Sequence, residues 1–257
     1  MKILVCIKQV PDMESKFKIA GDGKWYDSAD LVFRMNEYDE YAVEQAVRLK
    51  EQVGSADVTV LSIGGDRVKE TMKKALAMGC DRGVHIADNQ AWAKDPMVIA
   101  GIIAEYAGPE SFSCIFTGMQ SQDRGSAQTG VLLAEMLGLP CVTTIVDFSY
   151  SDGRFTVKRE LEGGIKALVN VQGPAVFTCQ LGLNTPRYPT LPNIMKAKKK
   201  ELQSLPVEHL QKIALHQKTE RLFFPEKKSG GLVLEGDAAD LADRLITILK
   251  QKTAVLA

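Results

Sequence analysis

Short apolar runs alternate with helical patterns along the first half of the chain, and this alternation restricts the fold more than any other feature. Residues 3–7 (Ile-Leu-Val-Cys-Ile) are apolar throughout, which is typical of a parallel strand buried on both faces. We expect strands at 3–7, 58–63, 83–86 and 114–117. Each is followed by a helix: one from about Asn36, one at 68–78, one at 96–106 and one beginning near Ser126. This order predicts an α/β fold with a doubly wound, mostly parallel sheet.

The pattern changes after Pro140. Residues 154–158 and 167–171 read as strands, and Ser151-Asp152-Gly153 reads as a turn before the first of them, so we expect antiparallel additions at the edge of the sheet. Periodicity then weakens until a final helix marked by Leu241, for which Asp237 is a possible N-cap. We therefore expect one domain over 1–205 and a tail over 206–257, with a linker at 225–231. The terminal helix either folds back on its own domain or reaches a partner subunit.

Composition excludes several classes of function. The 257 residues include 32 basic and 32 acidic side chains, and this balance does not favour nucleic acid or an anionic membrane as a partner. The five cysteines are scattered without a Cys-x-x-Cys pair, which favours reduced thiols and excludes a typical zinc or iron–sulfur site. We expect a cytoplasmic, bacterial protein with no targeting peptide and no direct membrane insertion. The histidines have no ligand or triad partners at suitable spacing, so we expect neither a metal site nor catalytic residues.

A polar, glycine-containing loop follows the strand at 114–117. Residues 118–130 read Gly-Met-Gln-Ser-Gln-Asp-Arg-Gly-Ser-Ala-Gln-Thr-Gly. In an open parallel sheet, ligands bind beyond the carboxyl ends of the strands, so this loop should meet the segments that follow Ile7 and Ile63. Backbone N–H groups and hydroxyls at a helix start suit an anion such as a phosphate. The alternative is an ordinary helix cap.

Two patterns suggest enzymes only weakly. Residues 62–66 (Ser-Ile-Gly-Gly-Asp) faintly resemble the pyrophosphate loop of ATP pyrophosphatases, but they follow the wrong strand and lack its second serine. The spacing of Glu160 and Glu162 resembles that of a pair of catalytic carboxylates. They lie beside Arg159 in a strand-like context, however, so a salt-bridged strand end is expected.

Residues 183–200 contain three prolines and a lysine cluster without core periodicity. Pro186, Pro189 and Pro192 fix φ and remove backbone donors, so we expect an irregular or extended arm. Its apolar side chains suit a docking segment, and an ordinary surface loop that closes a domain explains the composition equally well. Lysines follow at positions 196, 198, 199 and 200. They suit a solvated face or an acidic protein partner, because no aromatic residues interleave with them to stack on bases.

These segments resemble a known family. Leu183-Asn184, Pro186-Arg187-Tyr188, 191–200 and the block 157–164 (Val-Lys-Arg-Glu-Leu-Glu-Gly-Gly) are similar to the signature of the electron transfer flavoprotein beta subunit, and the resemblance extends from Lys2 to about Leu202. It implies an adenine-nucleotide alpha-hydrolase-like sheet and an electron carrier rather than an enzyme. The carrier would pair with an alpha subunit, which its C-terminal tail embraces. It would pass electrons from acyl-CoA or related dehydrogenases of fatty acid beta-oxidation to a membrane quinone oxidoreductase.

The resemblance also implies the cofactors and their sites. FAD would be shared with the alpha subunit, because this chain lacks a complete Gly-x-Gly-x-x-Gly fingerprint, and AMP would be bound as a structural ligand. The residues implied for AMP are Cys6, Asn36, Glu37, Tyr38, Asp39 and Ile63 around adenosine, with Gly118, Asp123, Ser126, Ala127, Gln128 and Thr129 toward the phosphate. Two positions depart from the family pattern, since Ala127 often corresponds to asparagine and Glu37 to proline.

Contacts with partners are implied as well. Met13 would lie near the flavin, and Glu160 would help to hold the mobile flavin domain. The docking residues would be Leu191, Pro192, Ile194, Met195 and Lys196.

Two other functions stay open. One is an electron-bifurcating relative with a second FAD in the AMP site. Residues 191–200 and 160–164 argue against it, because they follow the pattern of the simple carriers. The other is a free nucleotide-sensing protein of the universal-stress type, which leaves the arm at 183–200 without a purpose.

Overall fold

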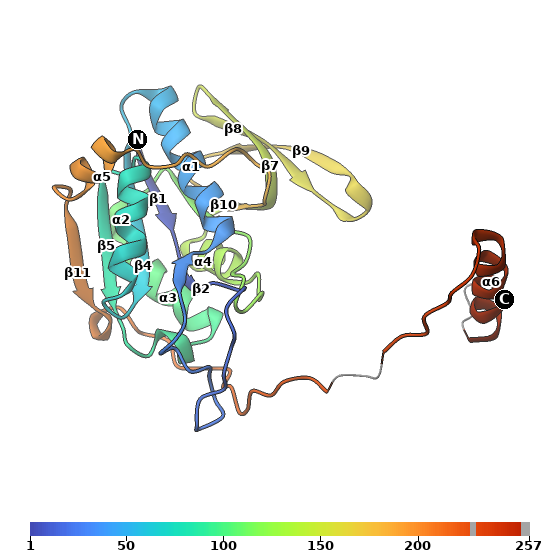
Figure 1. Cartoon of the computed structure of the whole chain (residues 1–257). Helices are drawn as coiled ribbons and strands as arrows, with labels where there is room; N and C mark the ends of the chain where they lie inside the picture. The colour runs from blue at the N-terminus through green and yellow to red at the C-terminus, as the bar shows by residue number, and fades with distance from the viewer. Residues whose placement is uncertain (227–229, 253–257) are drawn as a thin grey trace. The chain divides into compact units, whose positions relative to one another are not determined.

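The computed structural model describes residues 1–226 and 230–252 (Figure 1). Its strands are β1 (Lys2–Cys6), β2 (Gln9–Pro11), β3 (Phe33–Met35), β4 (Asp57–Gly64), β5 (Arg82–Ala87), β6 (Cys114–Gly118), β7 (Cys141–Ser151), β8 (Arg154–Glu160), β9 (Lys166–Gln172), β10 (Ala175–Cys179) and β11 (Leu202–Pro206). Its α-helices are α1 (Glu37–Val53), α2 (Val68–Met78), α3 (Pro96–Ala107), α4 (Thr129–Leu137), α5 (Leu191–Ala197) and α6 (Ala238–Lys252). Short 3₁₀ turns are η1 (Ala91–Ala93), η2 (Gly108–Glu110), η3 (Glu162–Gly164) and η4 (Val207–His209).

The main sheet has the order β11-β5-β4-β1-β6-β10-β7-β8-β9. The pairs from β11 to β7 are parallel, whereas β8 and β9 are antiparallel additions at one edge. In Figure 1 the β8–β9 hairpin extends away from the helices that cover the rest of the sheet. The predicted doubly wound, mostly parallel sheet with antiparallel edge strands is thus confirmed.

Both faces of the sheet carry a hydrophobic core. Ile3 and Val5 of β1 point to the face covered by α1 and α2, where they join one cluster of buried residues. Leu4 and Cys6 alternate with them and join the cluster beneath α3 and α4. Successive side chains of a strand point to opposite faces, so a continuously apolar strand is what a two-sided core requires.

The structure corrects three expectations in this part of the chain. The helix expected near Ser126 begins at Thr129, because Gly125 and Ala127 have positive φ values of 59° and 53°, which a helix does not accept. The weakly patterned region after Lys200 contains β11, which pairs in parallel with β5. The compact unit then continues to Leu222, beyond the expected boundary near 205.

The second unit comprises 223–257. Its helix α6 begins after Asp237, whose carboxylate accepts hydrogen bonds from the N–H groups of Ala239 and Asp240 at 3.0 and 3.1 Å, as expected for an N-cap. Part of the expected linker, residues 227–229, and the last residues of the tail, 253–257, lie outside the described residues. No helix in the described part of the chain is long and apolar enough to cross a bilayer.

Candidate functional site

The carboxyl ends of β1, β4 and β6 border one large cavity. Its volume is about 770 Å³, which lies within the range of small-molecule sites. The residues predicted for nucleotide binding that line it are Cys6, Asn36, Asp39, Ile63, Gly118, Asp123, Ser126, Ala127, Gln128 and Thr129. The structure therefore brings together segments that are far apart in the sequence, as the sheet topology requires.

Asp39 holds two of these strand ends together. Its carboxylate accepts hydrogen bonds from the N–H of Lys8 at 2.6 Å and from the N–H of Gly118 at 3.1 Å. Burial raises the pKa of Asp39 to about 7, while the hydrogen bonds from Lys8 and Gly118 act in the opposite direction. Asp39 thus connects the first turn of α1 to the ends of β1 and β6.

The loop between β6 and α4 forms another wall of the cavity. Asn36 fixes its start, because its side chain donates to the carbonyl of Gln120 at 2.8 Å and accepts from the N–H of Gln122 at 2.9 Å. The left-handed Gly125 and Ala127 then bend the loop before α4 begins. Successive N–H groups in such a bend, together with the hydroxyls of Ser126 and Thr129, can bind an anion.

An ion pair lies within this wall. The Lys8 ammonium is 2.6 and 2.7 Å from the two carboxylate oxygens of Asp123. The Asp123 side chain is only 5% exposed. Burial lowers the pKa of Lys8, and Asp123 acts in the opposite direction. The resemblance indicated Asp123 but not Lys8, which follows β1 as a lone lysine in an apolar context.

Aromatic residues complete the cavity, and the sequence analysis did not indicate them. Trp25 and Trp92 have ring centroids 5.7 Å apart, and the Arg124 guanidinium lies 4.7 Å from the centre of the Trp25 ring. Arg124 also donates to the carbonyls of Trp92 and Lys94. These are both tryptophans of the chain. A tryptophan near the glycines of a long loop is the signal that could have indicated Trp25.

Three of the predicted residues lie outside the cavity lining. Glu37 accepts a hydrogen bond from the side chain of Gln122 at 3.0 Å, and the Tyr38 hydroxyl accepts from that of Gln120 at 3.2 Å. Their side chains therefore brace the outside of the loop. Met13 is 44% exposed and does not line the cavity either.

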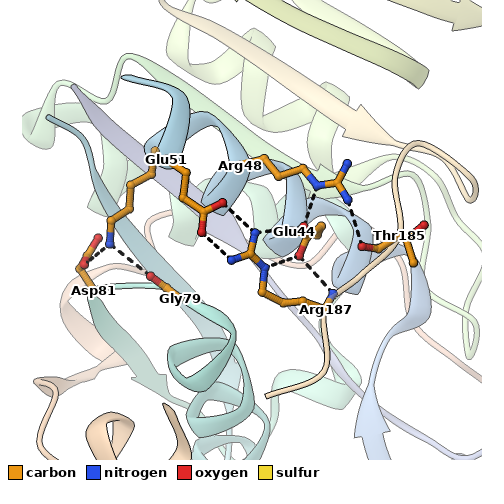
Figure 2. A network of polar contacts seen from close by, with 8 residues as sticks. Glu44, Arg48, Glu51, Gly79, Asp81, Thr185 and Arg187 are labelled. Atoms are coloured by element: carbon orange, nitrogen blue, oxygen red, sulfur yellow. Dashed lines mark hydrogen bonds and ion pairs between the residues drawn. The ribbon is translucent and has the colours of Figure 1, made fainter. Parts of the chain in front are cut away.

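The arm at 183–200 is anchored to α1. Figure 2 shows Arg187 bound to Glu44, with Arg187 Nε 2.8 Å from Glu44 Oε2, and to Glu51, with Nη1 2.6 Å from Oε1. Arg48 donates from Nε to Glu44 Oε1 at 2.6 Å and from Nη2 to the carbonyl oxygen of Thr185 at 3.2 Å. Burial acts to raise the pKa of Glu44, but hydrogen bonds from Arg187 and Arg48 outweigh it, so the pKa is lowered. The arm is thus fixed in place by ion pairs.

The tip of the arm is helical rather than irregular or extended. Thr190 caps α5 by accepting from the N–H of Asn193 at 3.4 Å, and Pro192 occupies the first turn, where a missing N–H costs nothing. Leu191 is 80% exposed and Met195 is 60% exposed. The residues predicted for docking therefore lie together on one short helix, and Lys196 is in its last turn.

Two charged residues have partners that the sequence analysis did not foresee. Lys200 donates to the carbonyl of Leu76 in the last turn of α2 and to that of Cys80 just after it, so it caps a helix end instead of joining the solvated lysines. Glu160 accepts from the side chain of Gln180 at 3.2 Å, and no ion pair with Arg159 is present within the described ranges.

The fold and the cavity define an α/β protein with an open, mostly parallel sheet and a large cavity at the carboxyl ends of its strands. Among the described residues, no group of histidine, cysteine or acidic side chains is arranged to hold a metal ion.

The comparisons with known proteins identify the family. A family profile for the "Electron transfer flavoprotein domain" matches residues 25–210. The chain is 35% identical to the electron transfer flavoprotein subunit beta of Bacillus subtilis, with all of both chains covered. It is 41% identical to that of Bradyrhizobium diazoefficiens over 79% of this chain and 80% of the relative. It is 38% identical to the mitochondrial one of Arabidopsis thaliana over 95% and 97%. The chain belongs to the electron transfer flavoprotein family.

Proposed function

We propose that this chain is the beta subunit of a heterodimeric electron transfer flavoprotein of the simple-carrier type. It pairs with an alpha subunit, accepts electrons from acyl-CoA or related dehydrogenases and passes them to a quinone oxidoreductase, without turnover of a substrate of its own. The proposal is supported by the relatives named subunit beta and by the simple-carrier residues in 157–164 and 191–200. The free thiols suit the reducing cytoplasm, where we place the protein.

The observation that carries this proposal is the convergence of the predicted nucleotide residues on one cavity. The residues fit AMP: hydroxyls and N–H groups of 125–129 suit a phosphate, and the apolar side chains of Cys6 and Ile63 suit a purine and ribose. The remaining lining residues do not form a dinucleotide fingerprint, so we assign FAD to the subunit interface, where it supplies the redox chemistry. Met13, Glu160 and the C-terminal unit with α6 are the proposed contacts with the alpha subunit and its flavin.

The nucleotide assignment is tested by introducing a negative charge into the loop. Thr129→Glu places a carboxylate at the start of α4, inside the cavity, where it repels a phosphate. We expect the AMP released from the denatured complex to fall to a small fraction of the wild-type amount, with a lower melting temperature because a structural ligand is lost. The matched control is Val131→Glu on the exposed side of the same helix, which is outside the cavity lining and should keep its AMP. Unchanged AMP in Thr129→Glu would place the nucleotide elsewhere.

The docking assignment is tested at Leu191. Its side chain is 80% exposed at the start of α5 and makes a suitable apolar anchor for a dehydrogenase. Leu191→Ala should slow electron transfer from a partner dehydrogenase about tenfold or more, measured by flavin reduction in stopped flow, while FAD content stays at the wild-type level. Leu215→Ala, which truncates another half-exposed leucine away from the arm, is the control. An unaltered rate in Leu191→Ala would remove this residue from the interface.

A further inference from the structure

The Lys8–Asp123 ion pair is the feature of the cavity that the proposed function leaves unexplained. Lys8 follows the carboxyl end of β1, and its ammonium reaches both oxygens of Asp123 and, at 3.3 Å, the hydroxyl of Ser121. The Lys8 side chain is 40% exposed and lines the cavity, whereas that of Asp123 is 5% exposed. The lysine is therefore accessible to a ligand, and the carboxylate lies behind it.

A carboxylate is an unfavourable neighbour for a phosphate. Asp123 lies in the loop whose N–H groups and hydroxyls suit an anion, and two negative charges at short range in a partly buried site repel each other. Such a loop accepts a phosphate only if the carboxylate is neutralised. Lys8 is positioned to neutralise it, because it contacts both of its oxygens.

The other charged groups around this part of the cavity do not compensate Asp123 in place of Lys8. Lys94 is paired with Asp88, and Asp39 directs its oxygens to the N–H groups of Lys8 and Gly118. Within the described ranges Arg124 has no carboxylate partner; it donates to two carbonyls and lies against Trp25. Arg124 is thus a cation of this loop that is held by neutral groups, and Lys8 is the group that compensates Asp123.

From this arrangement we infer that Lys8 determines ligand specificity: by neutralising Asp123, it lets the loop select a nucleoside monophosphate over the free nucleoside. This inference rests on the proposed function, because it assumes that an adenine nucleotide occupies the cavity. It assigns to Lys8 a role in recognising the phosphate.

The test measures binding of AMP and of adenosine to the co-expressed complex with the alpha subunit, after exchange of its bound nucleotide by dialysis. Lys8→Met should weaken AMP binding at least about tenfold and change adenosine binding less than about threefold, because only the phosphate meets the uncovered carboxylate. Adding Asp123→Asn to Lys8→Met should restore most of the AMP affinity. Lys8→Arg, which keeps the charge, should bind AMP within about threefold of the wild type.

Asp123→Asn alone is an independent test that can be used if the Lys8→Met complex does not assemble. It removes the carboxylate and leaves the Lys8 charge for the ligand, so AMP should bind more tightly while adenosine is unaffected. Equal weakening of AMP and adenosine in Lys8→Met, or no gain of AMP affinity in Asp123→Asn, would overturn the role of Lys8 and leave the proposed function intact. A wild-type complex that binds neither ligand would overturn both.

Discussion

Replacing Glu44 with alanine is expected to lower the free energy of unfolding by about 2 to 4 kcal/mol. The Glu44 side chain is 2% exposed and binds Arg187 through both of its oxygens, and removing one partner of a buried ion pair leaves the other without compensation. This loss is smaller than for a fully buried ion pair, because the Arg187 side chain is 33% exposed and retains its ion pair with Glu51. Urea unfolding of the isolated chain measures the effect.

The same measurement has a matched control and a pH dependence. Glu51→Ala removes the exposed partner of Arg187 and should cost less than about 1 kcal/mol. Because the pKa of Glu44 is lowered in the folded state, its contribution is present above the unfolded pKa near 4.5 and is lost as the pH falls through the folded pKa. The difference between wild type and Glu44→Gln should therefore shrink as the pH falls below about 4.5. Equal effects of Glu44→Ala and Glu51→Ala would contradict the anchoring role of Glu44.

Replacing Gly118 with alanine is expected to damage both stability and nucleotide binding. An added Cβ would lie 2.2 Å from the Asp39 carboxylate and 2.7 Å from Cβ of Tyr38, so the start of α1 must shift. Overpacking together with a weakened hydrogen bond to Asp39 should cost about 2 to 4 kcal/mol. We expect the melting temperature to fall and less AMP to be released from the denatured complex.

Gly108→Ala is the control for this substitution. Gly108 has helical φ and ψ, and an added Cβ would meet its nearest neighbour, Leu137, at 3.9 Å, so it should be nearly neutral. If Gly118→Ala were as stable as Gly108→Ala and retained its AMP, the close contact between the end of β6 and the start of α1 would not define the cavity.

Much of the fold could be predicted because its signals are local. The strand at 114–117 and the helix at 68–78 are specified by their own apolar patterns, and the structure contains both as β6 and α2. Strand β11 could not be predicted in this way, because its residues are mostly exposed or half-buried and it exists through pairing with β5. Helix α5 could not be predicted because prolines usually break a helix, whereas Pro192 lies in the first turn of this one, where it is tolerated.

The site was predictable only in part for a related reason. The loop at 118–130 has the composition of an anion site, and topology alone brings it to β1 and β4. Lys8 belongs to the site through its contact with Asp123, and Trp25 through its contact with Arg124. The sequence around Lys8 or Trp25 contains no pattern that predicts these contacts. The resemblance indicated Glu37 and Tyr38 as a continuous segment with Asn36 and Asp39, but α1 turns their side chains to the outside of the loop.

The most direct test of the whole account is to co-express this chain with its alpha subunit, denature the purified heterodimer and quantify the released FAD and AMP. A simple carrier whose cavity holds a structural nucleotide should release one FAD and one AMP. Two FAD and no AMP would contradict the account and assign the protein to the electron-bifurcating class. Failure to form a flavin-containing complex would instead favour a free nucleotide-sensing protein.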